Sequence, residues 1–254
     1  MSIPKPPRAV TFDCWSTLIS DSNWEQTMRR RQEALVSIAG KGGIELTPES
    51  AQVLIDAAWQ QHVASWRNGG VFGARGAADW IWAQPEMALA DDPDHALRDE
   101  LADRLALAIE DATTGEGTYV LPGAAEAIEA IKRAGVATAL VCDIGFTPAR
   151  FVRKFLPNHN IELDHYFFSD EVGAPKPLPA IFEAALAATG AQPDQAVHIG
   201  DLRRTDIAGA RNAGMASLRY TGIHDDQWHP EEARGKEADA VLHHWSELPD
   251  LLGI

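Results

Sequence analysis

The chain has 254 residues, of which 45% are hydrophobic, so it can bury a sizeable core and general disorder is not expected. Its 22 basic and 37 acidic residues give a formal charge of -15, which argues against surfaces that bind nucleic acid or anionic membranes, because these need a concentrated positive field. Two cysteines are too few for a disulfide framework, and no apolar run suits a signal peptide or a membrane span, so we expect a cytoplasmic protein.

The N-terminal segment RAVTFD, residues 8–13, is a short apolar run that ends in a carboxylate. This pattern is typical of a buried parallel strand, and it places Asp13 at the carboxyl edge of a sheet, where open α/β sheets have their sites. From about residue 22 to residue 111 the apolar residues follow helical periodicity, which predicts helices over residues 24–38, 48–66 and 95–111. Four glycines between residues 69 and 76 predict a loop within this helical block.

After Pro122, helices and strands alternate, which is the signature of βαβ units and a parallel sheet. The expected strands cover residues 136–142, 165–168, 196–200, 216–220 and 238–242, with helices between them. A single strand before the helical block cannot form a domain of its own. We therefore expect an α/β protein with a Rossmann-like parallel sheet core, residues 1–20 and 118–254, and an inserted all-helical cap domain, residues 21–117.

Four motifs hold the residues that could carry chemistry. They are FDCWSTL at 12–18, ALVCDIGFTP at 139–148, GAPKPLPAIF at 173–182 and HIGDLRRTDIAGARNAGM at 198–215. Each is weak alone, because an Asp after a strand often only caps a turn or a helix and a loop lysine is often only solvated. As an ordered set they resemble the haloacid dehalogenase-like hydrolases with a helical cap. The resemblance covers residues 8–18 and 122–252, and the cap matches only in being helical.

The resemblance implies a hydrolase whose nucleophile is Asp13. A carboxylate can attack an electrophilic phosphorus or carbon and form a covalent intermediate, which divides one difficult displacement into two easier ones. A small anionic substrate would be repelled unless cations offset the charge, and Lys176 and Mg²⁺ are the expected cations. Mg²⁺ prefers oxygen ligands, which Asp13, Asp201 and Asp206 can supply. The resemblance adds the backbone carbonyl of Trp15 as a further ligand.

The second motif departs from the family pattern at Cys142, where relatives carry a Ser or Thr that hydrogen-bonds the phosphoryl group. A thiol is a weaker donor than a hydroxyl, so phosphate binding is expected to depend more on backbone N–H groups at residues 143–145. We expect Cys142, Asp143 and Trp15 to lie against the substrate. The alternative for Cys142 is a role in packing only.

The first motif departs from the family pattern at Trp15, where phosphatases of the family carry a second Asp as the general acid/base. General acid/base catalysis typically contributes about 10²- to 10⁴-fold in rate. Dehalogenases of the family have an aromatic residue there, but they use no metal and replace the first Asp of the last motif with Ser, whereas this chain keeps Asp201. We therefore predict a Mg²⁺-dependent phosphatase acting on a small phosphorylated metabolite through an aspartyl-phosphate. The alternatives are a 2-haloacid dehalogenase-like hydrolase and a catalytically impaired binding or regulatory protein.

Overall fold

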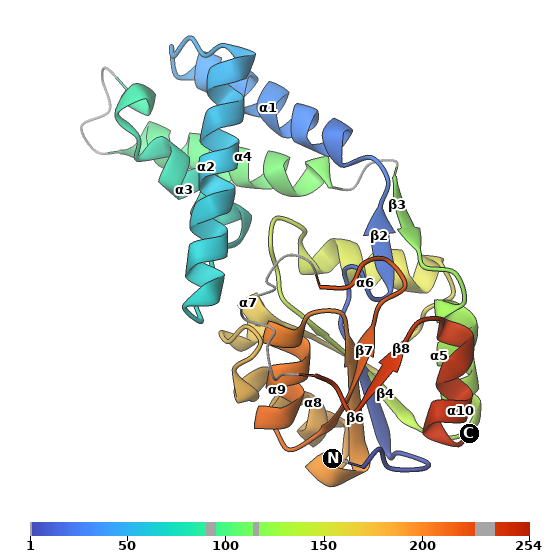
Figure 1. Ribbon diagram of the computed structural model, residues 1–254. Helices are drawn as coiled ribbons and strands as arrows, with labels where there is room; N and C mark the ends of the chain where they lie inside the picture. Colours follow the sequence, from blue (N-terminus) through green and yellow to red (C-terminus); the bar gives the residue numbers. More distant parts are fainter. Residues whose placement is uncertain (1, 90–94, 114–116, 227–236) are drawn as a thin grey trace. The chain divides into compact units, whose positions relative to one another are not determined.

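The computed structural model describes residues 2–89, 95–113, 117–226 and 237–254 of the chain. Two compact units are present, and each is described by itself. The core unit comprises Met1–Ser20, Tyr119–Asp143 and Val152–Ile254, and the helical unit comprises Asp21–Thr118 and Ile144–Phe151. The chain leaves the core unit through β2 (Ile19–Asp21) and returns through β3 (Thr118–Val120), which pair as a two-stranded sheet that the sequence did not predict (Figure 1).

The core unit contains a six-stranded parallel sheet, which confirms the α/β, Rossmann-like prediction. Its strand order is β5-β4-β1-β6-β7-β8. All five strands predicted after Pro122 and the strand before Asp13 are present, with small differences at their ends. Their bounds are β1 (Ala9–Phe12), β4 (Ala137–Cys142), β5 (His165–Phe168), β6 (Ala196–Gly200), β7 (Ala216–Tyr220) and β8 (Ala240–Leu242).

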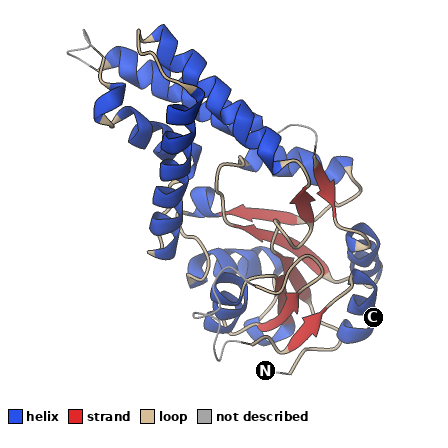
Figure 2. Ribbon diagram, turned by 45° about the horizontal axis from the view of Figure 1, so that its top comes forward, coloured by secondary structure: helices blue, strands red, loops and turns tan. Residues whose placement is uncertain are grey.

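Helices cover both faces of this sheet (Figure 2), and every residue of β1, β6 and β7 is accordingly buried. Ala9 and Val141 share a buried cluster with Phe182 of α8 on one face, whereas the ring of Phe12 lies 6.1 Å from that of Trp245 on the other. Alternate side chains of β1 therefore reach opposite faces. The α-helices that follow β3 in the chain are α5 (Ala124–Arg133), α6 (Ala149–Asn158), α7 (Ser169–Val172), α8 (Pro179–Thr189), α9 (Ala208–Asn212) and α10 (Leu248–Leu252).

The strand order reverses at β1, since β4 and β5 follow on one side of it and β6, β7 and β8 on the other. β1 and β6 are neighbours in register, with Phe12 opposite Ile199, and the amide of Asp13 donates to the carbonyl of Ile199 at 2.8 Å. Open α/β sheets bind their ligands at such a reversal, outside the carboxyl ends of the strands. The residues that follow β1 and β6 are Asp13 and Asp201, so the topology brings these two carboxylates to one place.

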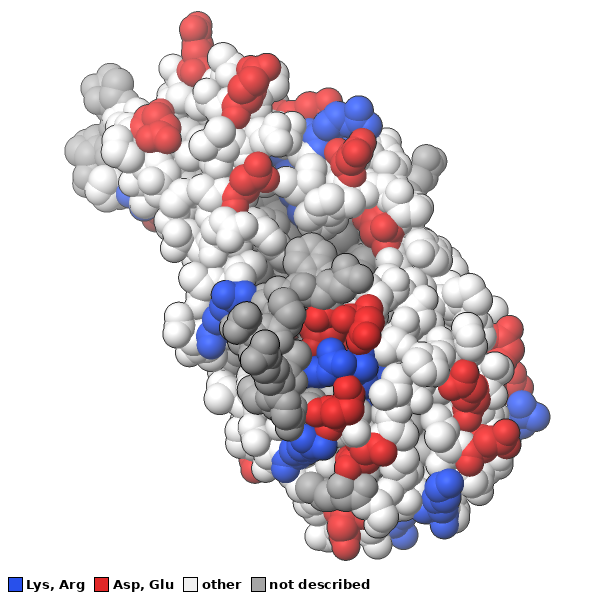
Figure 3. All heavy atoms as spheres, viewed as in Figure 1, with Lys and Arg blue, Asp and Glu red and all other residues white. Residues whose placement is uncertain are grey.

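On the face shown in Figure 3, acidic side chains are spread over the surface with lysine and arginine side chains between them. Among the described helices, none combines the length and apolarity needed to cross a membrane.

The helical unit is built from α1 (Trp24–Lys41), α2 (Pro48–Arg67), α3 (Gly73–Trp82) and α4 (Ala96–Ala112), with a short 3₁₀ turn, η1 (Pro85–Met87). The sequence predicted three of these helices, but the loop expected around the glycines was wrong in part, because α3 begins at Gly73 and contains Gly76. Glycine disfavours helix locally. Here burial outweighs that cost, since α3 packs on α2 and α4 and buries alanines and an isoleucine along one side.

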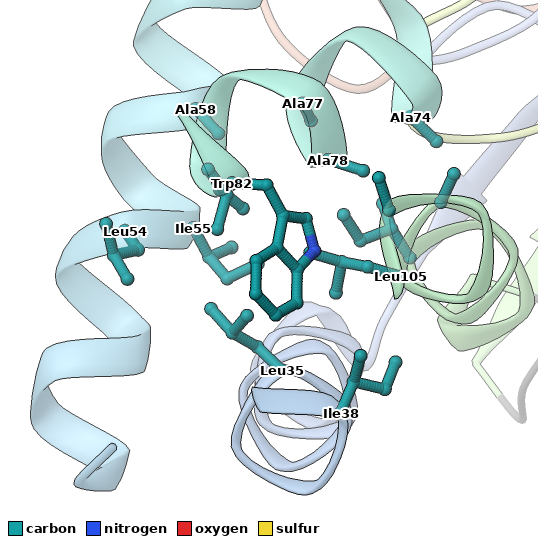
Figure 4. Packing of buried hydrophobic residues seen from close by; sticks show 14 of the residues in the cluster. Leu35, Ile38, Leu54, Ile55, Ala58, Ala74, Ala77, Ala78, Trp82 and Leu105 are labelled. Atoms are coloured by element: carbon teal, nitrogen blue, oxygen red, sulfur yellow. The ribbon is translucent and has the colours of Figure 1, made fainter. Parts of the chain in front are cut away.

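Trp82 lies in the apolar core between these helices and is 2% exposed. Its indole ring is surrounded by Leu35 of α1, Ile55 of α2 and Leu105 of α4 (Figure 4). Because four helices contribute to this one cluster, the helical unit has a core of its own.

Residues 144–151, which the sequence assigned to the core domain, pack with the helical unit instead. The ring of Phe146 lies 5.1 Å from that of Trp59, and the guanidinium of Arg31 lies 5.2 Å from the ring centroid of Phe146. Arg31 is itself buried, and burial lowers its pKa to about 10. The sequence could not predict this assignment, because the segment directly follows a core strand in the chain.

We predict that Trp82→Ala lowers the free energy of unfolding by about 3–5 kcal/mol, because it leaves a large cavity in the core of the helical unit. Val53→Ala on α2 is the control, since Val53 is 67% exposed and its truncation should stay within about 0.5 kcal/mol of the wild type. Urea unfolding followed by circular dichroism measures both. Equal losses for the two variants would contradict the assignment of Trp82 to the core.

Candidate active site

Asp13 is the first residue after β1, and its carboxylate accepts hydrogen bonds at both oxygens. Oδ1 accepts from Nζ of Lys176 at 2.5 Å and Oδ2 from the hydroxyl of Thr17 at 3.0 Å. Burial, with the negative charge of Asp206 adding to it, raises the pKa of Asp13 even though Lys176 opposes the shift. Asp13 is thus held in a defined orientation by neighbours on two sides. Thr17 was not singled out in the sequence, although it lies within the first motif.

Lys176 lies between α7 and α8 and is 2% exposed. Its ammonium bridges two carboxylates, with Nζ 2.5 Å from Oδ1 of Asp13 and 2.7 Å from Oδ1 of Asp206. Burial disfavours the charged form, but Asp13 and Asp206 outweigh it and hold the pKa of Lys176 well above its ordinary value. The lysine therefore stays cationic across the physiological pH range and joins the first, third and fourth motifs in space.

Asp206 lies in a short π-helical turn, η3 (Arg203–Ile207), and is 1% exposed. Each of its oxygens accepts two hydrogen bonds. Oδ1 accepts from Lys176 and from Nε2 of His198 at 3.2 Å, and Oδ2 accepts from the amide of Leu202 at 3.0 Å and the hydroxyl of Thr205 at 3.3 Å. Although burial alone would raise it, the charge of Lys176 and the contact with His198 hold the pKa of Asp206 well below its usual range.

Asp201 follows β6 and is 5% exposed. In the described residues, no lysine or arginine nitrogen lies within ion-pair distance of its carboxylate, and its nearest basic group is His224, whose Nε2 is 3.5 Å from Oδ2. Burial, and then the charges of Asp13 and Asp206, raise the pKa of Asp201 well above its usual value. Asp201 is thus a buried carboxylate whose charge the described side chains do not neutralise.

The donor set suits a divalent cation. One oxygen from each of Asp13, Asp201 and Asp206 lies within 4.8 Å of the others. When ionised, these three carboxylates outweigh the single ammonium of Lys176 and leave two negative charges in a buried place. Hard oxygen ligands with surplus negative charge are what Mg²⁺ binds in proteins, so the residues fit the expected ion.

Gly200, the last residue of β6, allows the close approach of Asp206. A Cβ atom at this position would meet Cγ of Asp206 at 2.3 Å and its Cβ at 2.5 Å. The glycine of the fourth motif is therefore required by packing against the carboxylate, and not by its backbone angles.

Trp15 is half-buried in a tight turn that follows Asp13. The amide of Ser16, whose φ is 58°, donates to the carbonyl of Ile19, and the amides of Leu18 and Ile19 both donate to the carbonyl of Cys14. This turn fixes the backbone at residue 15. Trp15 supplies no ionisable group there, and its contribution of a carbonyl to a metal stays a prediction.

Cys142 ends β4 and lies beside the other cysteine of the chain, Cys14. Its contact with the Cys14 thiol and its burial raise the pKa of Cys142 well above the ordinary value, so it is a neutral thiol. Sγ of Cys142 lies 3.5 Å from the carbonyl of Asp143, and Oδ1 of Asp143 accepts from the amide of Lys176 at 2.9 Å. One carboxylate oxygen of Asp143 thus supports the lysine loop.

Two further polar residues were missed in the sequence because they lie within a strand pattern. The hydroxyl of Thr11, on β1, is 2.8 Å from Nδ1 of His198, on β6. Both residues are fully buried, and the His198 ring also lies edge-on to that of Phe182. Burial lowers the pKa of His198, although Asp206 opposes the shift, so the ring is neutral.

Comparison with known proteins identifies relatives of this arrangement. A family model for haloacid dehalogenase-like hydrolases matches residues 7–214. A glyceraldehyde 3-phosphate phosphatase of Pyrococcus furiosus is 35% identical over 144 residues, which are 54% of this chain and 55% of that protein. The chain therefore spans about half the length of that curated relative.

Solved structures share the fold. The crystal structure of a HAD phosphatase from Thermococcus onnurineus matches with a TM-score of 0.64 and 20% identity, and covers 97% of this chain and 98% of that one. A 2-haloacid dehalogenase from Pseudomonas syringae pv. Tomato DC3000 matches with a TM-score of 0.68 and 21% identity over the same shares. At these identities the two structures bear on the fold alone. One of them is named a phosphatase and the other a dehalogenase.

We predict that Asp201→Asn stabilises the metal-free protein at pH 7. A carboxyl group whose pKa is raised by folding contributes stability below its unfolded pKa, and this contribution is lost as the pH rises through the folded pKa. Replacing the uncompensated charge should raise the free energy of unfolding by about 1–3 kcal/mol, or the melting temperature by roughly 2–4 °C per kcal/mol.

Melting in EDTA and in Mg²⁺ measures this effect. Mg²⁺ should stabilise the wild type but not Asp201→Asn, because the variant lacks a ligand. The exposed Asp194, changed to Asn, is the matched control and should behave as the wild type in both conditions. An Asp201→Asn variant less stable than the wild type in EDTA would contradict the charge argument.

Proposed function

The chain belongs to the haloacid dehalogenase-like hydrolases, and from this premise we propose that it is a Mg²⁺-dependent phosphatase acting on a small phosphorylated metabolite. The observation that carries the proposal is the buried cluster of Asp13, Asp201 and Asp206, two of which pair with Lys176, and which leaves two negative charges in excess when all three are ionised. Such a cluster suits a divalent cation and, with that cation, an anionic substrate. The phosphatase names among its relatives agree with it.

The proposed reaction begins with attack of a carboxylate oxygen of Asp13 on phosphorus. A bond from this oxygen to phosphorus forms, the ester bond breaks, and the leaving oxygen departs with the electron pair. Water then attacks the phosphorus of the aspartyl-phosphate, which releases inorganic phosphate and restores the carboxylate. The contacts of Asp13 with Lys176 and Thr17 support this role, because they orient the carboxylate.

We assign the metal ligands to Asp13, Asp201 and the backbone carbonyl of Trp15. Bound Mg²⁺ supplies positive charge that offsets the charge of the phosphoryl oxygens. We also assign Asp206 as a metal ligand, in addition to the four hydrogen bonds that its oxygens accept from the protein. Lys176 supplies the second positive charge, and its position between Asp13 and Asp206 supports a role in charge stabilisation.

The phosphate-binding role proposed for Cys142 and Asp143 depends on the neutral charge of the Cys142 thiol and on backbone N–H groups that follow it. A neutral Cys142 thiol does not repel an anion, as a thiolate would. Since the thiol is a weak donor, backbone N–H groups at residues 143–145 are proposed to make the main contacts with the phosphoryl group. Asp143 acts in this proposal chiefly by holding the backbone of Lys176.

The absence of a carboxylic acid at Trp15 restricts the leaving group. An alkoxide needs a proton as the ester bond breaks, and an indole cannot donate one efficiently. We infer that the substrate has a leaving group of low pKa or that another residue supplies the proton. The helical cap, residues 21–117, is proposed to select the substrate. The remaining expectations, a cytoplasmic location and no nucleic-acid or membrane partner, stay predictions.

Trp15 also favours the second candidate, hydrolytic dehalogenation of a 2-haloacid, in which the leaving halide needs no proton. Asp201 argues against it, because a carboxylate that binds metal has little use in halide displacement from a small acid. A third candidate is a binding or regulatory protein that retains the site but does not turn over a substrate. It is also suggested by Trp15, because this residue lacks the acid/base group that turnover of a phosphate ester uses.

We predict Mg²⁺-dependent hydrolysis of para-nitrophenyl phosphate that falls by at least about 10³-fold in Asp13→Asn, because the nucleophile is lost. Asp201→Ala should remove the Mg²⁺ dependence together with the activity, and Asp194→Asn should match the wild type. Release of para-nitrophenolate is measured by its absorbance. Chloride release from 2-chloropropionate without phosphatase activity would favour the dehalogenase, and no turnover of either substrate would favour the binding protein.

We predict that Trp15→Asp raises turnover of an alkyl phosphate more than that of para-nitrophenyl phosphate. A carboxylic acid at this position can protonate a poor leaving group, and the gain should be at least about tenfold for the alkyl substrate. Trp15→Asn, which has the same size as Trp15→Asp but no proton to transfer, is the control. The ratio of kcat/KM for the two substrates is the measurement, and an unchanged ratio would show that position 15 does not limit protonation.

A further inference from the structure

We propose that His198, held by Thr11, is a positioning residue that fixes the Asp206 carboxylate and, through it, the ammonium of Lys176. The effect on turnover rests on the proposed function. The effect on cation affinity rests on it as well, whereas the effect on the site's geometry does not, because it follows from the hydrogen bonds of the buried residues alone.

The sheet register aligns the members of this chain of contacts. Thr11 of β1 lies directly opposite His198 of β6, so their side chains project from the same face. The Thr11 hydroxyl is 2.8 Å from Nδ1, and Nε2 is 3.2 Å from Oδ1 of Asp206. The edge-on ring of Phe182, with centroids 4.9 Å apart, limits rotation of the imidazole. No part of His198 reaches solvent.

The direction of these hydrogen bonds follows from the chemistry of the partners. An ionised carboxylate only accepts, so Nε2 must carry the proton that is donated to Asp206. In a neutral imidazole Nδ1 is then an acceptor, and the Thr11 hydroxyl is the donor that it meets. Thr11 therefore stabilises the tautomer that can hold Asp206, as outer partners of metal-site histidines do.

His198 affects the rest of the site through one oxygen atom, Oδ1 of Asp206. Oδ1 of Asp206 accepts from both His198 and Lys176, and Nζ of Lys176 also contacts Oδ1 of Asp13. The other oxygen of Asp206 is held by Leu202 and Thr205. Without the His198 donor, Oδ1 keeps Lys176 as its single partner, so the lysine and the nucleophile are less well fixed.

A packing role for His198 is the competing explanation, since the residue is buried against Phe182. The most informative variant is therefore Thr11→Val, which keeps the side-chain shape and removes only the hydroxyl. Thr11→Ser restores the hydroxyl. Thr189→Val at the end of α8 is the matched control, because the Thr189 hydroxyl donates to carbonyls of its own helix.

The first measurement is the tautomer of His198 in the metal-free protein, from nitrogen-15 and proton NMR of labelled imidazoles. We expect the form protonated at Nε2. A proton on Nδ1 in place of Nε2 would overturn the proposal whether or not the protein binds metal or has activity.

The second measurement is the affinity for Mg²⁺ alone, by calorimetry, together with kcat and KM for para-nitrophenyl phosphate. Thr11→Val should weaken Mg²⁺ binding or lower kcat by about tenfold, the lower end of the effect of outer partners, with little change in KM. Thr11→Ser should recover most of the loss. Because Thr11→Val leaves the buried Nδ1 without its donor, its melting temperature should fall further than that of Thr189→Val, and affinity and kcat are compared at a temperature at which both variants are folded.

A Thr11→Val variant with the Mg²⁺ affinity and kcat of the wild type would overturn the proposal. So would equal losses in His198→Gln, which keeps an N–H donor toward Asp206, and in His198→Leu, which does not. A wild-type protein that binds Mg²⁺ but does not hydrolyse the substrate would instead count against the proposed function, and the Mg²⁺ affinities of the variants would still decide the role of His198.

Discussion

The buried ion pairs of Lys176 with Asp13 and Asp206 are the constraint on which the rest of the site depends. Charges removed from water are costly unless they are paired and hydrogen-bonded, so each of these groups limits where the others can lie. One ammonium cannot balance three ionised carboxylates, and burial, followed by the charges of Asp13 and Asp206, raises the pKa of Asp201 well above its usual value. The cluster of three carboxylates that could hold a cation is therefore a property of the folded core unit.

Sheet topology makes this arrangement possible. Because the strand order reverses at β1, the ends of β1 and β6 lie side by side. Asp13 and Asp201, which are far apart in the chain, therefore lie close together. The face that carries α8 supplies the second layer of the site through Thr11 and His198. The same parallel register that builds the core thus also orients the carboxylates.

The departures from the family pattern are the uncharged residues Cys142 and Trp15, whereas Asp13, Lys176, Asp201 and Asp206 follow the pattern. Cys142 is a neutral thiol beside Cys14, and Trp15 offers no acid, so the surroundings of Asp13 are less polar than a Ser and an Asp would make them. Under the proposed function, this combination would keep the means of binding a cation and an anion, while it would reduce the means of protonating a leaving group. The proposed chemistry would thereby be restricted at the leaving group more than at Asp13.

The order of residues determined the α/β class, the strands and the four motifs, because apolar runs and the carboxylates that end them are local patterns. It also identified Asp13, Lys176, Asp201 and Asp206, since a resemblance to known motifs needs no coordinates. It could not identify Thr11 and His198, which look like strand residues until β1 and β6 are paired, nor the helix α3, where burial outweighs the glycines. Tertiary structure alone decided that Lys176 pairs with Asp13 and Asp206 and that Asp201 has no lysine or arginine partner among the described residues, because charge balance depends on distances between segments that are remote in the chain.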